Sequence, residues 1–159
     1  MAHGDITLSE IKSQPGTWAT ALSVFGRQVE QVRAFWAAGK FDQVVFTGCG
    51  STYYLGVIGA TLLQAATGVP ARACSASELP CSRRRISARR GRRCWSAFRA
   101  PARPETVEWC ASFGSNGAGR VLVVTRYGDS PLAASADLVL AVDAAREDSL
   151  ASRPARSAA

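Results

Sequence analysis

The sequence predicts an α/β fold: a three-layer αβα sandwich built on a parallel sheet and preceded by N-terminal helices. Beyond residue 40, short apolar strands alternate with helical stretches, which is the chain order of a parallel sheet covered on both faces. The strands are continuous runs such as Val44-Val45-Phe46, typical of strands buried on both sides. A chain of 159 residues, 47% hydrophobic and 19% charged, is long and apolar enough for such a core.

Residues 1–40 predict two entry helices. Apolar residues recur at spacings of three and four in the stretch Trp18–Phe25 and again from Val29 to Trp36. The pair Pro15-Gly16 indicates a turn, and Gly39 is expected to end the second helix. Such apolar stripes either cover their own sheet or form the interface of a homodimer, and the sequence does not decide between the two.

Residues 41–151 predict a single domain, and residues 152–159 form a tail outside it. A glycine-rich turn follows the first strand, Gly68 and Pro70 stop the first helix, and Asp129-Ser130-Pro131 is a helix N-terminus. The predicted strands are 44–46, 71–74, 121–125 and 138–142, and the predicted helices are 53–67, 104–113 and 131–136.

The net charge of +7 comes from one anomalous segment. Residues 81–103 contain nine arginines and no acidic residue. The remaining 136 residues hold 19 − 9 = 10 basic and 12 acidic residues, so their net charge is −2. The basic character therefore belongs to this segment and not to the whole domain.

The turn Gly48–Thr52 joins the first strand to a helix and is the best candidate for a binding site. Ligands of parallel sheets bind beyond the carboxyl ends of the strands. Glycines let the backbone approach an anion, the amides and dipole of a helix N-terminus stabilise negative charge, and Ser51 and Thr52 add hydroxyl donors. This pattern favours a phosphate. The alternative is a tight turn in which Ser51 only caps the helix and Cys49 is an inert thiol.

Several other kinds of site are not expected. The five cysteines form no Cys-x-x-Cys pair, and the single histidine, His3, stands near the N-terminus, so we expect neither a metal nor another cofactor. No apolar run is long enough for a membrane span, and the first residues lack the pattern of a signal peptide. We therefore expect a cytoplasmic protein with no membrane partner.

The stretch VVFTGCGSTYYLGVIGATLLQAATGVPARACSASE, residues 44–78, resembles the sugar isomerase (SIS) domain. EIKSQPGTW is similar to the entry helix of such domains, and VLVVTRYGDSPLAASADLVLAVDAAREDSLA to their later part. The resemblance is greatest to the isomerase half of glutamine–fructose-6-phosphate aminotransferases and to related aldose–ketose isomerases. It implies a flavodoxin-like fold and a site for a phosphorylated sugar, such as a hexose or hexosamine phosphate.

The resemblance also implies which residues bind the sugar phosphate. Cys49, Gly50, Ser51 and Thr52 match the first binding loop of the family. Glu78 matches its acidic residue, and Leu150 with Ala151 matches a segment whose backbone lines the sugar. In the resembled isomerases the catalytic groups come from a second SIS domain. No residue is therefore nominated here as catalytic, and whether the chain is an enzyme stays open.

The family's second phosphate loop, Ser-x-Ser-Gly-x-Thr, is replaced by residues 81–103. This segment is either a genuine basic insertion or a stretch translated out of frame, and we favour the second hypothesis. Shifted codons from Arg93 to Pro104 can read Leu-Leu-Val-Gly-Val-Ser-Arg-Ser-Gly-Thr-Thr, a strand followed by the missing loop. Residues 152–157 can likewise read Gln-Thr-Arg-Ser-Phe, which resembles the next family motif. On this hypothesis the chain is a truncated form of a longer enzyme.

As written, the basic segment is expected to be a disordered surface loop that leaves a gap at the centre of the sheet. Arginines cannot be buried in a central strand without a large cost of desolvation. The residues concerned are Arg83, Arg84, Arg85, Arg89, Arg90, Arg92 and Arg93.

The expected function is phosphosugar binding by a truncated SIS domain that is not catalytic alone. One alternative is a regulatory module that senses a phosphosugar without turnover. A less favoured alternative is nucleic-acid binding, in which the arginines of residues 81–103 contact phosphates while Trp95 and Phe98 stack on bases.

Overall fold

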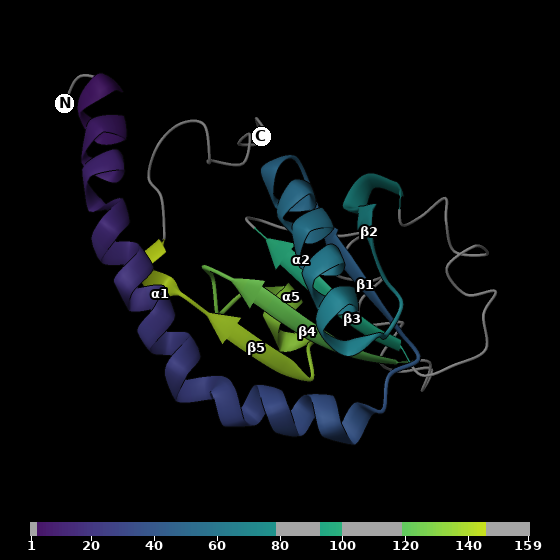
Figure 1. Cartoon of the computed structure of the whole chain (residues 1–159). Helices are drawn as coiled ribbons and strands as arrows, with labels where there is room; N and C mark the ends of the chain where they lie inside the picture. The colour runs from purple at the N-terminus through teal and green to yellow at the C-terminus, as the bar shows by residue number, and fades with distance from the viewer. Residues whose placement is uncertain (1–2, 79–92, 100–118, 146–159) are drawn as a thin grey trace.

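The computed structural model describes residues 3–78, 93–99 and 119–145, and for residues 93–99 it describes the backbone alone. Five parallel strands form one sheet in the order β2-β1-β3-β4-β5. Figure 1 shows α2 lying across one face of this sheet and the long, bent helix α1 passing its β5 edge. The elements are α1 (His3–Gly39), β1 (Gln43–Gly48), α2 (Ser51–Thr67), β2 (Ala71–Ser75), η1 (Ala76–Glu78), β3 (Arg93–Arg99), β4 (Gly119–Thr125), α5 (Pro131–Ala134), β5 (Leu138–Ala141) and η2 (Asp143–Ala145).

Strand β1 is buried along almost its whole length. The residues from Val44 to Gly48 are all buried, and Val45 is fully inaccessible. Val44 and Phe46 belong to a cluster with Phe35 and Phe41 under α1 and α2. The continuous apolar run thus forms a strand covered on both faces, as predicted.

Helix α2 lies close to β1 because its inward side carries glycines. A Cβ at Gly56 or Gly59 would lie 3.2 or 3.1 Å from the Phe46 side chain, closer than ordinary van der Waals contact. The helix ends at Gly68, whose left-handed conformation lets its N–H donate to the Gln64 carbonyl. The predicted helix and its stop are both confirmed.

The prediction of two N-terminal helices is wrong, because α1 is a single helix of 37 residues with Pro15 inside it. A proline in a helix removes one backbone hydrogen bond and crowds the preceding turn. Both Pro15 and Gly16 are exposed, so no packed neighbour forces a turn there. Because helical sequence flanks Pro15 on both sides, α1 continues through the proline.

The end of α1 also differs in detail from the expected glycine cap. The residue with a left-handed backbone is Lys40, with φ of 43°, and not Gly39. Gly39 is instead needed for packing, because a Cβ there would overlap the Phe41 ring. The Phe41 ring in turn lies 5.5 Å from that of Phe35 and 5.4 Å from that of Trp36.

The expected gap at the centre of the sheet is absent. Strand β3 pairs in parallel with β1 on one side and with β4 on the other, so residues 93–99 supply the central strand. The run Cys94-Trp95-Ser96-Ala97-Phe98 carries no charge, and of the seven arginines expected to prevent a strand only Arg93 lies in β3, at its first position. The other six lie outside the described residues, and the out-of-frame hypothesis stays a prediction.

The C-terminal strands agree with the sequence patterns. Strands β4 and β5 fall where they were predicted, and Val121 and Val123 in β4 are fully buried. Ser130 caps the short helix α5, since its hydroxyl accepts the Ala133 N–H at 3.3 Å. The predicted helix 104–113 and the tail 152–159 lie outside the described residues.

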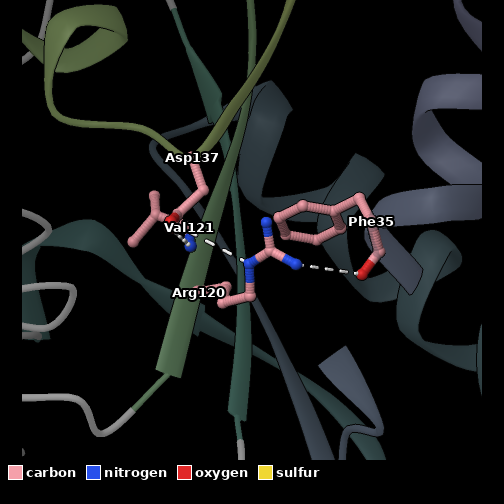
Figure 2. Close-up of polar contacts among 4 residues, drawn as sticks. All are labelled: Phe35, Arg120, Val121 and Asp137. Atoms are coloured by element: carbon pink, nitrogen blue, oxygen red, sulfur yellow. Dashed lines mark hydrogen bonds and ion pairs between the residues drawn. The ribbon is translucent and has the colours of Figure 1, made fainter. Parts of the chain in front are cut away.

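A polar cluster around Arg120 joins α1 to the sheet (Figure 2). The Arg120 guanidinium lies 4.4 Å from the centre of the Phe35 ring and donates to the Phe35 carbonyl at 3.5 Å. Its Nε is 3.9 Å from Asp137 Oδ1, while Asp137 Oδ2 accepts the Val121 N–H at 2.7 Å. One arginine therefore connects α1, β4 and the residue before β5.

Replacing Arg120→Ala is expected to lower the free energy of unfolding by about 1 kcal/mol, because the cation–π contact is lost and the half-exposed ion pair adds little. Chemical denaturation followed by circular dichroism measures the change. Arg33→Ala is the matched control, since its ion pair with Glu30 is 71% and 76% exposed and contributes less than about 0.5 kcal/mol. Equal effects of the two substitutions would contradict the role given to Arg120.

Candidate functional site

The candidate site lies where the order of strands reverses. From β1 the chain moves through α2 to β2 on one side, and β3 then pairs with the opposite side of β1. The switch point therefore lies at the carboxyl ends of β1 and β3. Such switch points are where open α/β sheets bind ligands.

The loop from β1 to α2 depends on two glycines. Gly50 has φ of 57° and ψ of −127°, a backbone conformation that side chains rarely allow. A Cβ at Gly48 would lie 2.7 Å from the Thr52 carbonyl carbon. These two positions explain why the strand passes into the helix within only a few residues.

Thr52 holds this loop closed. Its Oγ1 accepts the Cys49 N–H at 2.9 Å and donates to the Cys49 carbonyl at 2.8 Å. The Tyr53 N–H donates to the Gly50 carbonyl at 3.0 Å. The hydroxyl of Thr52 thus serves the loop itself, which is a structural role that the sequence did not reveal.

The N-terminus of α2 lacks a side-chain cap within the described structure. The N-cap residue is Gly50, and no side chain bonds to the first amide groups there. The alternative in which Ser51 caps the helix is therefore not what the structure shows; Ser51 is the first helical residue and is exposed. An uncapped helix N-terminus presents amide groups and positive potential to an anion.

Glu78 comes to the same edge of the sheet as this loop. Parallel pairing of β1 with β2 sets Gly48 opposite Ser75, and Glu78 follows in η1. The Cys74 Sγ lies 3.8 Å from Glu78 Oε2, while Glu78 itself is exposed. Two predicted site segments, the loop and Glu78, are thus brought to neighbouring strand ends.

Cys49 and Cys74 have different environments. Cys49 is exposed in the loop, whereas Cys74 is buried at the end of β2. Burial and the adjacent Glu78 carboxylate raise the pKa of the Cys74 thiol above its ordinary value of 9.0. Cys74 is therefore the less reactive thiol of the two.

Two polar residues at this edge were not singled out by the sequence patterns. Thr47, just before the loop, is 2% exposed, and its hydroxyl has no hydrogen-bond partner within the described structure. Arg126 follows β4 directly, with its guanidinium 5.3 Å from the centre of the Tyr127 ring. The available signal was Arg126, a charged residue directly after the valine-rich strand predicted at 121–125.

The remaining predicted site residues cannot be placed beside the loop. Leu150 and Ala151 lie outside the described residues. Within the described ranges, no group of three or more His, Cys, Asp or Glu side chains is arranged to hold a metal ion. In the same ranges, no helix has the length and apolar character required to cross a bilayer.

Gly50→Ala is expected to cost about 1–3 kcal/mol of unfolding free energy, because an alanine is strained at the observed φ and ψ. Thermal and urea denaturation measure the loss. Gly16→Ala is the control: a Cβ there meets nothing within 4 Å, so helix propensity should make that change neutral or stabilising. A neutral Gly50→Ala would contradict a positive φ at position 50.

Iodoacetamide at pH 8 is expected to modify Cys49 at least about tenfold faster than Cys74, because only Cys49 is exposed and the pKa of Cys74 is raised. Peptide mass spectrometry distinguishes the two sites, and the two rates should converge in denaturant. Equal alkylation rates in the folded protein would contradict the burial of Cys74.

Because folding raises the pKa of the Cys74 thiol, the contribution of this thiol to the free energy of unfolding is complete below pH 9 and declines as the pH rises further.

Solved structures with the same arrangement were found by structural comparison. A tagatose-6-phosphate ketose/aldose isomerase from Escherichia coli matches with a TM-score of 0.75 and 21% identity, over 91% of this chain and 43% of that one. The C-terminal domain of a glucosamine-fructose-6-phosphate aminotransferase from Francisella tularensis matches with a TM-score of 0.66 and 17% identity, over 89% of this chain and 40% of that one.

A third similar structure is the sugar isomerase domain of an RpiR transcription factor from Sphaerobacter thermophilus. Its TM-score is 0.61 and its identity 20%, over 86% of this chain and 73% of that one. No protein-family model and no curated protein matches the sequence. The chain spans about two-fifths of the isomerase and aminotransferase structures. At these identities the likeness concerns the fold, and the chain has the fold of the sugar isomerase (SIS) domain.

Proposed function

We propose that this chain binds a phosphorylated sugar, such as a hexose or hexosamine phosphate, with the phosphate at the loop Cys49–Thr52. The observation that carries the proposal is the N-terminus of α2, which no side chain of the described structure caps and which lies at the switch point of the sheet. Support also comes from similar structures whose names refer to tagatose 6-phosphate and fructose 6-phosphate.

The loop offers a phosphate space and hydrogen-bond donors, and Arg126 adds a positive charge from the end of β4. Gly50 leaves room for the anion beside the backbone, because a Cβ at this position would meet no atom within 4 Å. The exposed hydroxyl of Ser51 is available as a donor, and the Ser51 amide at the start of α2 adds to it, since the Thr52 and Tyr53 amides already donate to the Cys49 and Gly50 carbonyls. Arg126, at the carboxyl end of β4, contributes positive charge at the same edge of the sheet.

The sugar is proposed to extend from this loop toward η1. Glu78 is exposed there, so its carboxylate can accept hydrogen bonds from sugar hydroxyl groups. Leu150 and Ala151 stay in the proposal on the family resemblance alone. The boundaries 1–40 for the entry segment and 41–151 for the binding domain are proposed on the same footing.

We propose binding without turnover by this chain alone. Isomerisation needs a base positioned beside the protons at sugar C1 and C2. The acidic residue nominated near the loop, Glu78, lies against a buried thiol at 3.8 Å, and the family resemblance assigns it no role as a base. A sensing module is the second candidate, favoured by the similarity to a transcription-factor domain. Nucleic-acid binding through residues 81–103 stays a weaker alternative.

Fructose 6-phosphate at 100 times its dissociation constant is expected to stabilise the chain by about 2.7 kcal/mol. Differential scanning fluorimetry followed by titration calorimetry measures this, with fructose and inorganic phosphate as comparison ligands. Fructose alone should have little effect, since the phosphate provides most of the recognition. A coupled assay should detect no glucose 6-phosphate; turnover would show that the chain is itself an isomerase.

Ser51→Ala is expected to weaken this binding about tenfold, as a lost hydrogen bond to a charged group costs about 1.5 kcal/mol. The matched control is Ser13→Ala, because Ser13 is an exposed helical serine that bonds only the Glu10 carbonyl within the described structure. Equal affinities of the two variants would show that the phosphate does not bind at the N-terminus of α2. Binding of a short oligonucleotide in place of sugar phosphates would favour the nucleic-acid alternative.

A further inference from the structure

Strand β2 lies at an edge of the sheet, and within the described structure only its β1 side is paired with another strand. The Val44 N–H donates to the Pro70 carbonyl at 2.9 Å, which fixes the side of β2 that faces β1. Backbone groups alternate in direction along a strand, so the Arg72 backbone also faces β1, whereas Ala71 and Ala73 direct their N–H and C=O groups away from it. An open edge of this kind is a template for another strand.

One outward group of this edge already has a partner. Gln64 Oε1, from α2, accepts the Ala71 N–H at 2.9 Å. The amide side chain thus occupies the place at which a neighbouring strand would supply a carbonyl oxygen. Within the described residues, the Ala71 C=O and both backbone groups of Ala73 have no such partner. The free part of the edge therefore begins directly after the N–H that Gln64 protects.

A groove of about 460 Å³ lies between α2 and β2, beside this open edge. Small side chains form much of its walls: Ala60, Ala65, Ala71 and Ala73. Because Gln64 reaches the outward N–H of β2, side chains of α2 extend past β2 to its open side. Successive side chains of a strand point to opposite faces, so a strand added to β2 would place every second side chain toward the groove.

Arg72 gives this edge a positive charge. It alternates with Ala71 and Ala73, so its side chain starts from the opposite face of the strand. Arg72 is exposed, and within the described ranges it forms no ion pair. Helix α2 contains no charged side chain, and β2 contains no carboxylate. The edge therefore combines small apolar side chains on one face with a cation on the other.

We propose that the β2 edge binds an extended peptide segment of another protein by strand addition, and that this segment has the pattern apolar–acidic–apolar. Its backbone pairs with the free groups of Ala71 and Ala73, its two apolar side chains enter the groove, and its carboxylate meets Arg72. Charge complementarity selects this occupant, because the edge offers a cation and no anion. The proposal does not depend on the proposed sugar-phosphate site.

Fluorescence anisotropy of a labelled peptide, Ser-Val-Glu-Val-Ser, titrated with the whole chain tests the proposal. The expected result is saturable binding. A Ser-Val-Lys-Val-Ser peptide should bind about tenfold more weakly, because like charges on directly opposed strand positions are destabilising.

Reversing the charge of the edge should reverse this preference. Arg72→Glu is expected to bind the lysine peptide more tightly than the glutamate peptide. Arg27→Glu is the matched control, because Arg27 is also exposed but lies on α1, where it donates to the Ser23 hydroxyl at 2.9 Å. This control should keep the preference of the unmodified chain. Circular dichroism and the melting temperature check that both variants are folded.

Methylation of the peptide's backbone nitrogens separates strand pairing from side-chain contacts. In an added strand, alternate residues turn their N–H groups toward β2, and the others turn theirs away from it. Methylating one alternating set should therefore abolish binding, while methylating the other set should leave it nearly unchanged. The protein is the same in both measurements, so a loss of folding cannot explain the difference.

Absence of saturable binding would overturn the proposal. So would an Arg72→Glu chain that still prefers the glutamate peptide, because the carboxylate would then not lie against Arg72. Equal effects of the two methylated sets would also overturn it, because the peptide would then not be held by strand pairing.

Discussion

The burial of β1 on both faces and both edges is the constraint on which the rest of this structure depends. Hydrogen bonds to β2 and β3 satisfy its backbone, while aromatic residues of α1 and the glycine side of α2 cover one face. At the end of this enclosed strand the chain turns directly into α2, and Gly48 and Gly50 make this tight turn possible. The turn leaves the N-terminus of α2 at the carboxyl end of β1, where a ligand can reach it.

The two edge strands of the sheet, β5 and β2, have different surroundings. At the β5 edge, Gln28 of α1 donates to the Val139 carbonyl at 3.4 Å, and Arg120 connects α1 to β4. Long helices that cover an edge strand protect its unpaired backbone from other chains. At the β2 edge the structure instead has a groove between α2 and β2. The β5 edge is thus contacted by α1, whereas the β2 edge borders a groove.

The patterns that predicted elements correctly were those set by local burial and turn chemistry. Continuous valine runs, the Gly68 stop and the Ser130 cap act over a few residues, so they can be recognised without the fold. The turn at Pro15 was wrong because a proline limits but does not forbid a long helix. The predicted gap at the centre of the sheet was wrong. That prediction rested on the number of arginines and overlooked a short uncharged run, which forms β3 and pairs with a strand on each side.

By itself the sequence determined the α/β class, most of the strands and the loop Gly48–Thr52, because strand burial and glycine turns depend on neighbouring residues. Only the tertiary structure decided which strand ends meet. It set Gly48 opposite Ser75, brought Glu78 toward the loop and placed Arg126 at the same edge of the sheet. It also left the apolar side of α2 exposed. These features depend on strand order and on contacts between distant segments, which spacing along one chain does not encode.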